Sequence, residues 1–177
     1  MLYLMQIGGV MSVESQRNHN NLSGLEYVQA MAKNQIDMPA MAKTIPMKCV
    51  AADSGTVTFT ARADARHLNR VDNVHGGFVA TVLDSVASNA LRTLLEAGTV
   101  FATIELNVKF IRPIRHDKDL RAVGKAINRS RQLGIAEAQL FDEENKLCAH
   151  CTATFMVINR KDRDAGHETR DTIESGV

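Results

Sequence analysis

The chain has 177 residues, which is enough for one domain with a hydrophobic core. Its apolar fraction of 45% and charged fraction of 23% are typical of a soluble globular protein. The net charge of +1 gives no reason to expect nucleic acid or an acidic membrane surface as a partner, and the absence of Trp argues against a base-stacking surface.

The first half of the chain is predicted to contain a leader, a short helix and a hairpin. Residues 1–23 open with a short apolar stretch that lacks Lys and Arg and continue with Asn, Ser and Gln. We therefore expect a disordered leader that is neither a signal peptide nor a membrane span. An amphipathic helix is predicted over 25–36. Two strands follow, 47–51 and 56–63, with a hairpin turn at 53–55 between them.

The second half begins with a helical pattern and then changes to strands. Apolar periodicity from Gly76 to Ala97, closed by Gly98, predicts one long helix of about 33 Å. Four strands are predicted after it, namely 101–111, 120–128, 134–141 and 146–157. The charged residues 159–177 lack apolar periodicity and are expected to form a solvated tail. A single long helix with an antiparallel sheet predicts one α+β domain over 24–158, in which the sheet wraps around the helix.

Three cysteines, Cys49, Cys148 and Cys151, are too few for a disulfide framework. Together with the lack of a secretion signal, this predicts a cytoplasmic location. Cys148 and Cys151 form a C-x-x-C, but they fall in a predicted strand, where residues three apart point to opposite faces. Two thiolates on opposite faces cannot share a metal ion. We therefore expect packed cysteines and no metal site.

Two glycines, Gly76 and Gly77, stand at the start of the predicted long helix. The first backbone N–H groups of a helix have no intrahelical acceptor, and the helix dipole favours a negative oxygen beside them. Glycine also lets a ligand come close to the backbone. The turn is therefore a candidate oxyanion-binding site, although two glycines could simply ease a tight turn into the helix.

Asp84 lies inside the same helix, at the apolar edge of its polar stripe. A carboxylate there costs free energy unless it is paired or used, and its pKa should rise, which suits a general base. A partly exposed Asp with no role is the alternative. Asp84 is about 12 Å from Gly76 along the helix axis, so one carbonyl cannot easily meet both groups. A two-fold dimer with its helices side by side would bring Gly76 of one chain near Asp84 of the other.

The stretch His75-Gly76-Gly77, with Asp84 nine residues after the histidine, resembles the hotdog-fold thioesterases of the phenylacetate-pathway (PaaI-like) type. The segment T-I-E-L-N-V-K-F-I-R-P at 103–113 is similar to the strand that follows the helix in that family, and the similarity extends over 47–157. The resemblance implies a hotdog fold and hydrolysis of acyl-CoA to free acid and CoA. It implies no cofactor, because CoA belongs to the substrate, and it implies a homodimer that assembles into a homotetramer.

The resemblance also implies a role for each of five residues. Asp84 matches the general base or nucleophile, and Gly76 matches the amide that polarises the thioester carbonyl. His75 matches the residue that caps and orients the turn. Asn69 matches a side chain near the thioester or the attacking water, and Thr103 matches a hydroxyl near the acid. In that family the equivalents of Asn69 and Gly76 come from one subunit, and those of Asp84 and Thr103 come from the other.

For the CoA moiety, the resemblance implies two groups of binding residues. They are Phe110, Arg112 and Arg115 after the strand that follows the helix, and Asn128, Arg129, Ser130 and Arg131 in a later turn. Arginine suits phosphate through its paired N–H donors, although surface arginines are often ordinary charges. The sequence departs from the family at Asn73 and Ser130, where glycine is frequent.

Two other functions stay open at this point. A hotdog hydratase or dehydratase acting on acyl thioesters would pair a catalytic His with an acid in a different motif, whereas His75 belongs to the turn. A non-catalytic acyl-CoA binding module is the second alternative, although the chain has no helix-turn-helix and no basic patch to relay a signal. The remaining central histidines, His67, His116 and His150, have no metal-ligand spacing between them.

Overall fold

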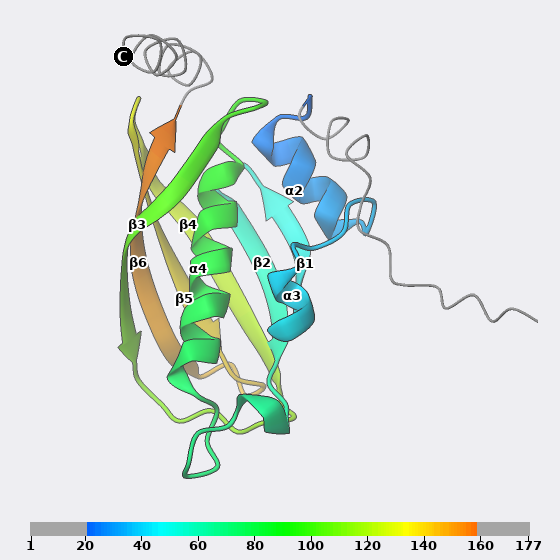
Figure 1. The fold of residues 1–177 in the computed structure, drawn as a ribbon, viewed down its shortest axis with the longest axis vertical. Helices are drawn as coiled ribbons and strands as arrows, with labels where there is room; N and C mark the ends of the chain where they lie inside the picture. The colour runs from blue at the N-terminus through cyan, green and yellow to red at the C-terminus, as the bar shows by residue number, and fades with distance from the viewer. Residues whose placement is uncertain (1–20, 159–177) are drawn as a thin grey trace, which may run out of the picture.

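The computed structural model describes residues 21–158, and its strands form one antiparallel sheet in the order β1-β2-β4-β5-β6-β3. They are β1 (Met47–Asp53), β2 (Thr56–Arg62), β3 (Val100–Phe110), β4 (Asp119–Arg129), β5 (Leu133–Phe141) and β6 (Leu147–Ile158). The sheet curls around one long helix, α4 (Gly76–Arg92), as Figure 1 shows. The predicted α+β arrangement of a sheet wrapped around a long helix is confirmed.

All six predicted strands are present, with ends that differ from the prediction by at most two residues. The hairpin between β1 and β2 turns at Gly55, whose φ of 77° is readily adopted only by glycine. The turn between β5 and β6 is held by Asp142, whose Oδ1 accepts the N–H groups of Glu144 and Lys146 at 3.0 and 2.8 Å. Burial alternates along β2 and β5, as expected for strands with one face on the core.

The core lies between α4 and the concave face of the sheet. Val82, Leu83 and Val86 of α4 are fully buried there. A Cβ placed on Gly124 of β4 would lie 2.6 Å from the backbone oxygen of Val86. Glycine is therefore required at this position for the strand to approach the helix so closely.

The long helix is shorter than predicted, because it ends at Arg92 and not at Ala97. The Thr93 hydroxyl donates to the Ala90 carbonyl and accepts the N–H of Gly55, both at 2.7 Å. The bond from Gly55 ties the helix end to the β1–β2 hairpin, so the chain turns there although its apolar pattern continues. Gly98 has a left-handed φ of 74°, but it lies beyond the helix, just before β3.

Two shorter helices precede the sheet, α2 (Gly24–Ala32) and α3 (Met41–Thr44). Ser23 and Glu26 form a capping box at the start of α2. The helix predicted over 25–36 is too long, because Asn34 adopts a left-handed φ of 56° and the N–H groups that follow Lys33 bond back to α2. This is a Schellman ending with Asn in the usual glycine position.

The predicted leader and tail lie mostly outside the described residues. Of the predicted leader, residues 21–23 are described, with Ser23 capping α2 and Leu22 packed against the core. The tail prediction for 159–177 falls wholly outside them. Between residues 21 and 158, the structure has no helix long and apolar enough to cross a membrane.

Candidate active site

The turn before α4 leaves one backbone donor unused. His75 caps the helix: its Nδ1 accepts the Gly77 N–H at 2.9 Å, and its carbonyl accepts the Phe78 N–H at 3.0 Å. Between them, the Gly76 N–H has no acceptor among residues 21–158. The predicted cap and the predicted free amide are therefore both present in the structure, and this N–H can donate to a ligand.

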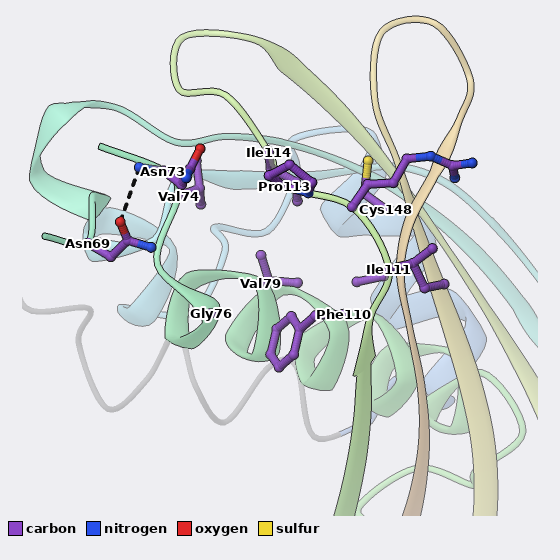
Figure 2. Close-up of a pocket in the computed structure, with 12 residues that line it drawn as sticks. Asn69, Asn73, Val74, Gly76, Val79, Phe110, Ile111, Pro113, Ile114 and Cys148 are labelled. Atoms are coloured by element: carbon purple, nitrogen blue, oxygen red, sulfur yellow. Dashed lines mark hydrogen bonds between the residues drawn. The ribbon is translucent and has the colours of Figure 1, made fainter. Parts of the chain in front are cut away.

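A second donor comes from Asn69 in the loop that leads to this turn. Its Oδ1 accepts the N–H groups of Val71 and Asn73, at 3.0 and 3.2 Å. Because the carboxamide oxygen is occupied in this way, the NH₂ group must face away from the loop backbone. Figure 2 shows this nitrogen pointing away from the Asn73 N–H and toward the segment that runs from Val74 to Gly76.

Both donors line a cleft of about 410 Å³ between the start of α4 and the segment that follows β3 (Figure 2). Most of its lining residues are apolar, but polar atoms form almost half of the lining surface. The residues are Asn69, Asn73, Val74, Gly76, Val79, Phe110, Ile111, Arg112, Pro113, Ile114, Cys148 and Ala149. A cleft in which apolar residues surround a few convergent polar groups is typical of a small-molecule site.

Phe110 lies directly against Gly76 at the edge of this cleft. A Cβ on Gly76 would lie 3.2 Å from Cζ of the Phe110 ring, which is closer than side chains normally pack. Any larger residue at position 76 would therefore displace the ring or the turn. Phe110 nevertheless remains 60% exposed, so much of the ring surface is free to contact a ligand.

Asp84 is half-buried on the side of α4 that faces β3, and Oδ1 of its carboxylate accepts a hydrogen bond from the Thr103 hydroxyl at 2.9 Å. Burial raises the pKa of Asp84, and the bond from Thr103 offsets part of that rise. Asp84 and Thr103 are therefore neighbours within one chain.

Thr103 reaches Asp84 because β3 carries a β-bulge. Thr103 pairs with Phe155 and Glu105 pairs with Thr154, so Ile104 is left without a partner in β6. The extra residue lets both Thr103 and Leu106 face the helix, although strict alternation would place them on opposite faces. The bulge is thus the local feature that directs the hydroxyl to the acid.

Within one chain, the acid and the cleft are separate. Asp84 and Thr103 do not line the cleft that holds Asn69 and Gly76. Along α4, Gly76 and Asp84 are about 12 Å apart. The five predicted residues therefore form two groups, one at the first turn of the helix and one further along it.

The predicted CoA-binding residues are also divided. Phe110 and Arg112 line the cleft, and Nη1 of Arg112 donates to the Leu147 carbonyl at 2.6 Å. Arg115 is exposed three residues further on. In contrast, the turn with Asn128, Arg129, Ser130 and Arg131 lies at the other end of the sheet, since Arg129 is in register with Gly134, Phe155 and Thr103. The fold of a single chain does not bring the two groups together.

The sequence did not identify several residues of the cleft. Val79 lies in α4, Ile111 directly follows β3, and Cys148 lies in β6, so only the folded chain brings them together. All three cysteines are free and buried, as expected for packed cysteines. Within residues 21–158, no group of three or more His, Cys, Asp or Glu side chains is placed to hold a metal ion.

Comparisons with known proteins point to one family. The model of the thioesterase superfamily matches residues 72–149. The structure of a phenylacetic acid degradation-related protein from Ralstonia eutropha JMP134 is 30% identical, with a TM-score of 0.67 over 73% of this chain and 98% of that chain. A thioesterase structure from Haemophilus influenzae is 25% identical, with a TM-score of 0.65 over 72% and 88%. Human acyl-coenzyme A thioesterase 13 is 23% identical over 115 residues, which are 65% of this chain and 79% of the relative.

An antiparallel sheet that wraps around one long helix is the hotdog fold, which the solved thioesterase structures share. The chain belongs to the thioesterase superfamily and is of the PaaI-like type. The predicted family is thus confirmed, and the class of activity is thioester hydrolysis.

Proposed function

We propose that this protein hydrolyses acyl-CoA thioesters in a site that two copies of the chain complete. One protomer supplies Gly76 and Asn69, and its partner supplies Asp84 and Thr103. The observation that carries the proposal is the free Gly76 N–H, which opens onto a cleft while the half-buried acid of the same helix lies about 12 Å away. A second copy is the simplest source of an acid beside that amide.

The geometry supports a definite reaction. The thioester oxygen accepts hydrogen bonds from the Gly76 N–H and the Asn69 NH₂ group, and these donors stabilise the negative charge that develops during attack. In one route the partner's Asp84 takes a proton from a water molecule, the water oxygen attacks the carbonyl carbon, the C–S bond breaks, and the sulfur leaves with that proton as the CoA thiol. In the other route the partner's Asp84 attacks the carbonyl carbon itself, the C–S bond breaks to leave an acyl anhydride on the carboxylate, and the thiolate takes a proton from solvent. Water then hydrolyses the anhydride, which releases the free acid and restores the carboxylate.

The exposed edge of the sheet at β3 supports the proposal that a second copy of the chain binds there. Hydrogen bonds pair β3 with β6 on one side, whereas no strand within residues 21–158 pairs with its other side. Ile104 and Phe110 are 53% and 60% exposed on this strand. An unpaired edge with large apolar side chains is a ready surface for strand pairing with another chain.

Antiparallel pairing of two β3 strands would also unite the predicted CoA-binding residues. The Phe110 end of one β3 would meet the Val100 end of the other, which is the end near the β4–β5 turn. Arg112 at the cleft and Arg131 of the partner's turn would then border one groove, with guanidinium groups suited to phosphates. The relationship to human acyl-coenzyme A thioesterase 13 supports CoA as the leaving group.

The proposal is tested by measuring thiol release from a panel of aromatic and straight-chain acyl-CoAs with Asp84→Asn and Asp84→Ala. We expect kcat to fall by about 10²- to 10⁴-fold in both variants, because each removes the general base or nucleophile. Asp53→Asn is the matched control, since this acid is exposed at the far hairpin and should leave kcat unchanged. Near-full turnover by both Asp84 variants would refute the assignment, and acyl-CoA binding without thiol release by the unaltered protein would refute hydrolysis.

A further inference from the structure

His67 is a buried polar residue that the proposed reaction does not use directly. It ends the short 3₁₀-helix η1 (Ala65–His67) and is 8% exposed. Its Nε2 lies 2.8 Å from the Thr44 carbonyl oxygen, and its Nδ1 accepts the Asp64 N–H at 3.1 Å. A carbonyl oxygen can only accept, so Nε2 carries a proton. The Asp64 carboxylate, 3.0 Å from Nδ1, is itself bound by Arg66.

The same residue holds the start of α4. The His67 carbonyl accepts the His75 N–H at 2.8 Å, which fixes the residue that caps the helix. The His67 ring packs edge-on against Phe78 in the first turn of α4, with ring centroids 4.9 Å apart. His67 therefore holds the backbone of His75, which precedes Gly76, and the side chain of Phe78, which follows it.

His67 also leads into the loop that presents the second donor. Asn69 follows it by two residues, and the Asn69 N–H closes the loop by donating to the Asn73 carbonyl at 2.8 Å. The loop then returns through His75 to the His67 carbonyl. The Asn69 side chain and the Gly76 amide thus lie at the two ends of one loop. His67 holds both ends, because it precedes Asn69 in the chain and its carbonyl bonds to the N–H of His75.

We propose that His67 is a positioning residue that sets the distance between the two oxyanion donors, Asn69 and Gly76. It contacts neither the cleft nor Asp84, so it acts through the loop alone. Loss of the bond to Thr44 frees the 3₁₀-helix from the segment before β1. The ends of the loop at Asn69 and His75 can then shift. Donors that stabilise charge only in the transition state affect kcat more than KM, and a displacement of about 1 Å can cost about 10²-fold. This inference rests on the proposed function.

Two conservative variants separate the contacts of the ring. In His67→Gln the longer side chain can still donate an N–H to the Thr44 carbonyl. In His67→Asn the side chain keeps an acceptor near the Asp64 N–H but is too short to reach Thr44. We expect His67→Asn to lower kcat by about 10- to 100-fold with little change in KM, and His67→Gln to recover most of that loss.

Two controls distinguish positioning from a loss of stability. Val57→Ala removes two methyl groups from a buried side chain of β2, far from the loop, and should lower the melting temperature with no change in kcat per folded molecule. His116→Ala removes an exposed histidine and should change neither quantity. A His67→Asn variant that is destabilised like Val57→Ala but keeps the kcat of the unaltered protein would overturn the proposal.

A measurement without substrate separates this inference from the proposed function. Hydrogen exchange followed by ¹⁵N NMR should show faster exchange at the Gly77 and His75 amides in His67→Asn than in the unaltered protein, because both depend on the fixed turn. Unchanged exchange at both amides would overturn the role of His67. If the unaltered protein releases no thiol from any acyl-CoA, the proposed function fails, and the exchange data still decide whether His67 holds the turn.

Discussion

Two opposing influences act on Asp84. Burial on α4 destabilises its charged form and raises its pKa, whereas the hydroxyl of Thr103 donates to the carboxylate and lowers it. The net effect raises the pKa of Asp84 toward neutral pH, and a general base works best when its pKa lies near the working pH. A single hydroxyl therefore adjusts the pH at which the proposed base becomes active.

Thr103→Val should move the acid limb of the kcat/KM profile to higher pH. The base acts only when it is deprotonated, which requires a pH above its pKa. Removing the bond that stabilises the carboxylate raises that pKa further, because the Thr103 hydroxyl bonds to the charged form of the acid. Thr103→Ser keeps the hydroxyl and should leave the limb in place. A limb that stays fixed or moves to lower pH in Thr103→Val would contradict this account of Asp84.

At the scale of the elements, sequence patterns predicted those boundaries that depend only on neighbouring residues in the chain. The helix start at Gly76 was predicted because the helical pattern begins there, and the structure places it there. The helix end was predicted five residues too late, because Thr93 is bonded to the Gly55 N–H of a distant hairpin. No pattern within the helix could reveal that contact.

The bulge in β3 shows the same limit of local patterns. Alternation in this strand places Thr103 on the face opposite to Leu106, which would direct the hydroxyl away from the helix. The extra residue at Ile104 changes that relation. The position of Thr103 beside Asp84 was available only from the resemblance to a family, because bulges have no reliable sequence signal.

The close contact of β4 with α4 gives a prediction about stability. Gly124→Ala places a methyl group 2.6 Å from the Val86 carbonyl oxygen, so the strand or the helix must move. We expect the free energy of unfolding in urea to fall by about 1–3 kcal/mol. Lys125→Ala, at the exposed neighbouring position, should change it by no more than about 0.5 kcal/mol. Equal stability of Gly124→Ala and the unaltered protein would show that the contact is looser than described.

At the scale of the whole molecule, helix geometry predicted from the sequence that Gly76 and Asp84 lie too far apart on one chain to act on the same carbonyl. The 1.5 Å rise per residue separates Gly76 from Asp84 by about 12 Å, and the structure keeps them in separate groups. The lining of the cleft was beyond sequence reasoning, because Ile111 and Cys148 meet there only after β3 and β6 pair. Periodicity shows which face of a strand is buried, but it does not show which strands become neighbours.

Pairing through the β3 edge predicts that a charge on this edge weakens the dimer. Ile104→Arg should shift the protein toward monomer in sedimentation velocity, and its specific activity should fall on dilution, because the proposed site needs two chains. Val50→Arg places the same charge on β1, at the opposite edge of the sheet, and should leave both properties unchanged. A fully dimeric and active Ile104→Arg protein would contradict an interface at the β3 edge.

The division of the site between two chains is tested most directly by a heterodimer of two inactive parents. Asn69→Ala and Asp84→Asn carry different affinity tags, are co-expressed, and are purified through both tags in succession. If one chain supplies the donors and the other supplies the acid, one of the two sites is intact, and thiol release should return to about half of the unaltered dimer's activity. A doubly tagged heterodimer as inactive as its parents would contradict the shared site.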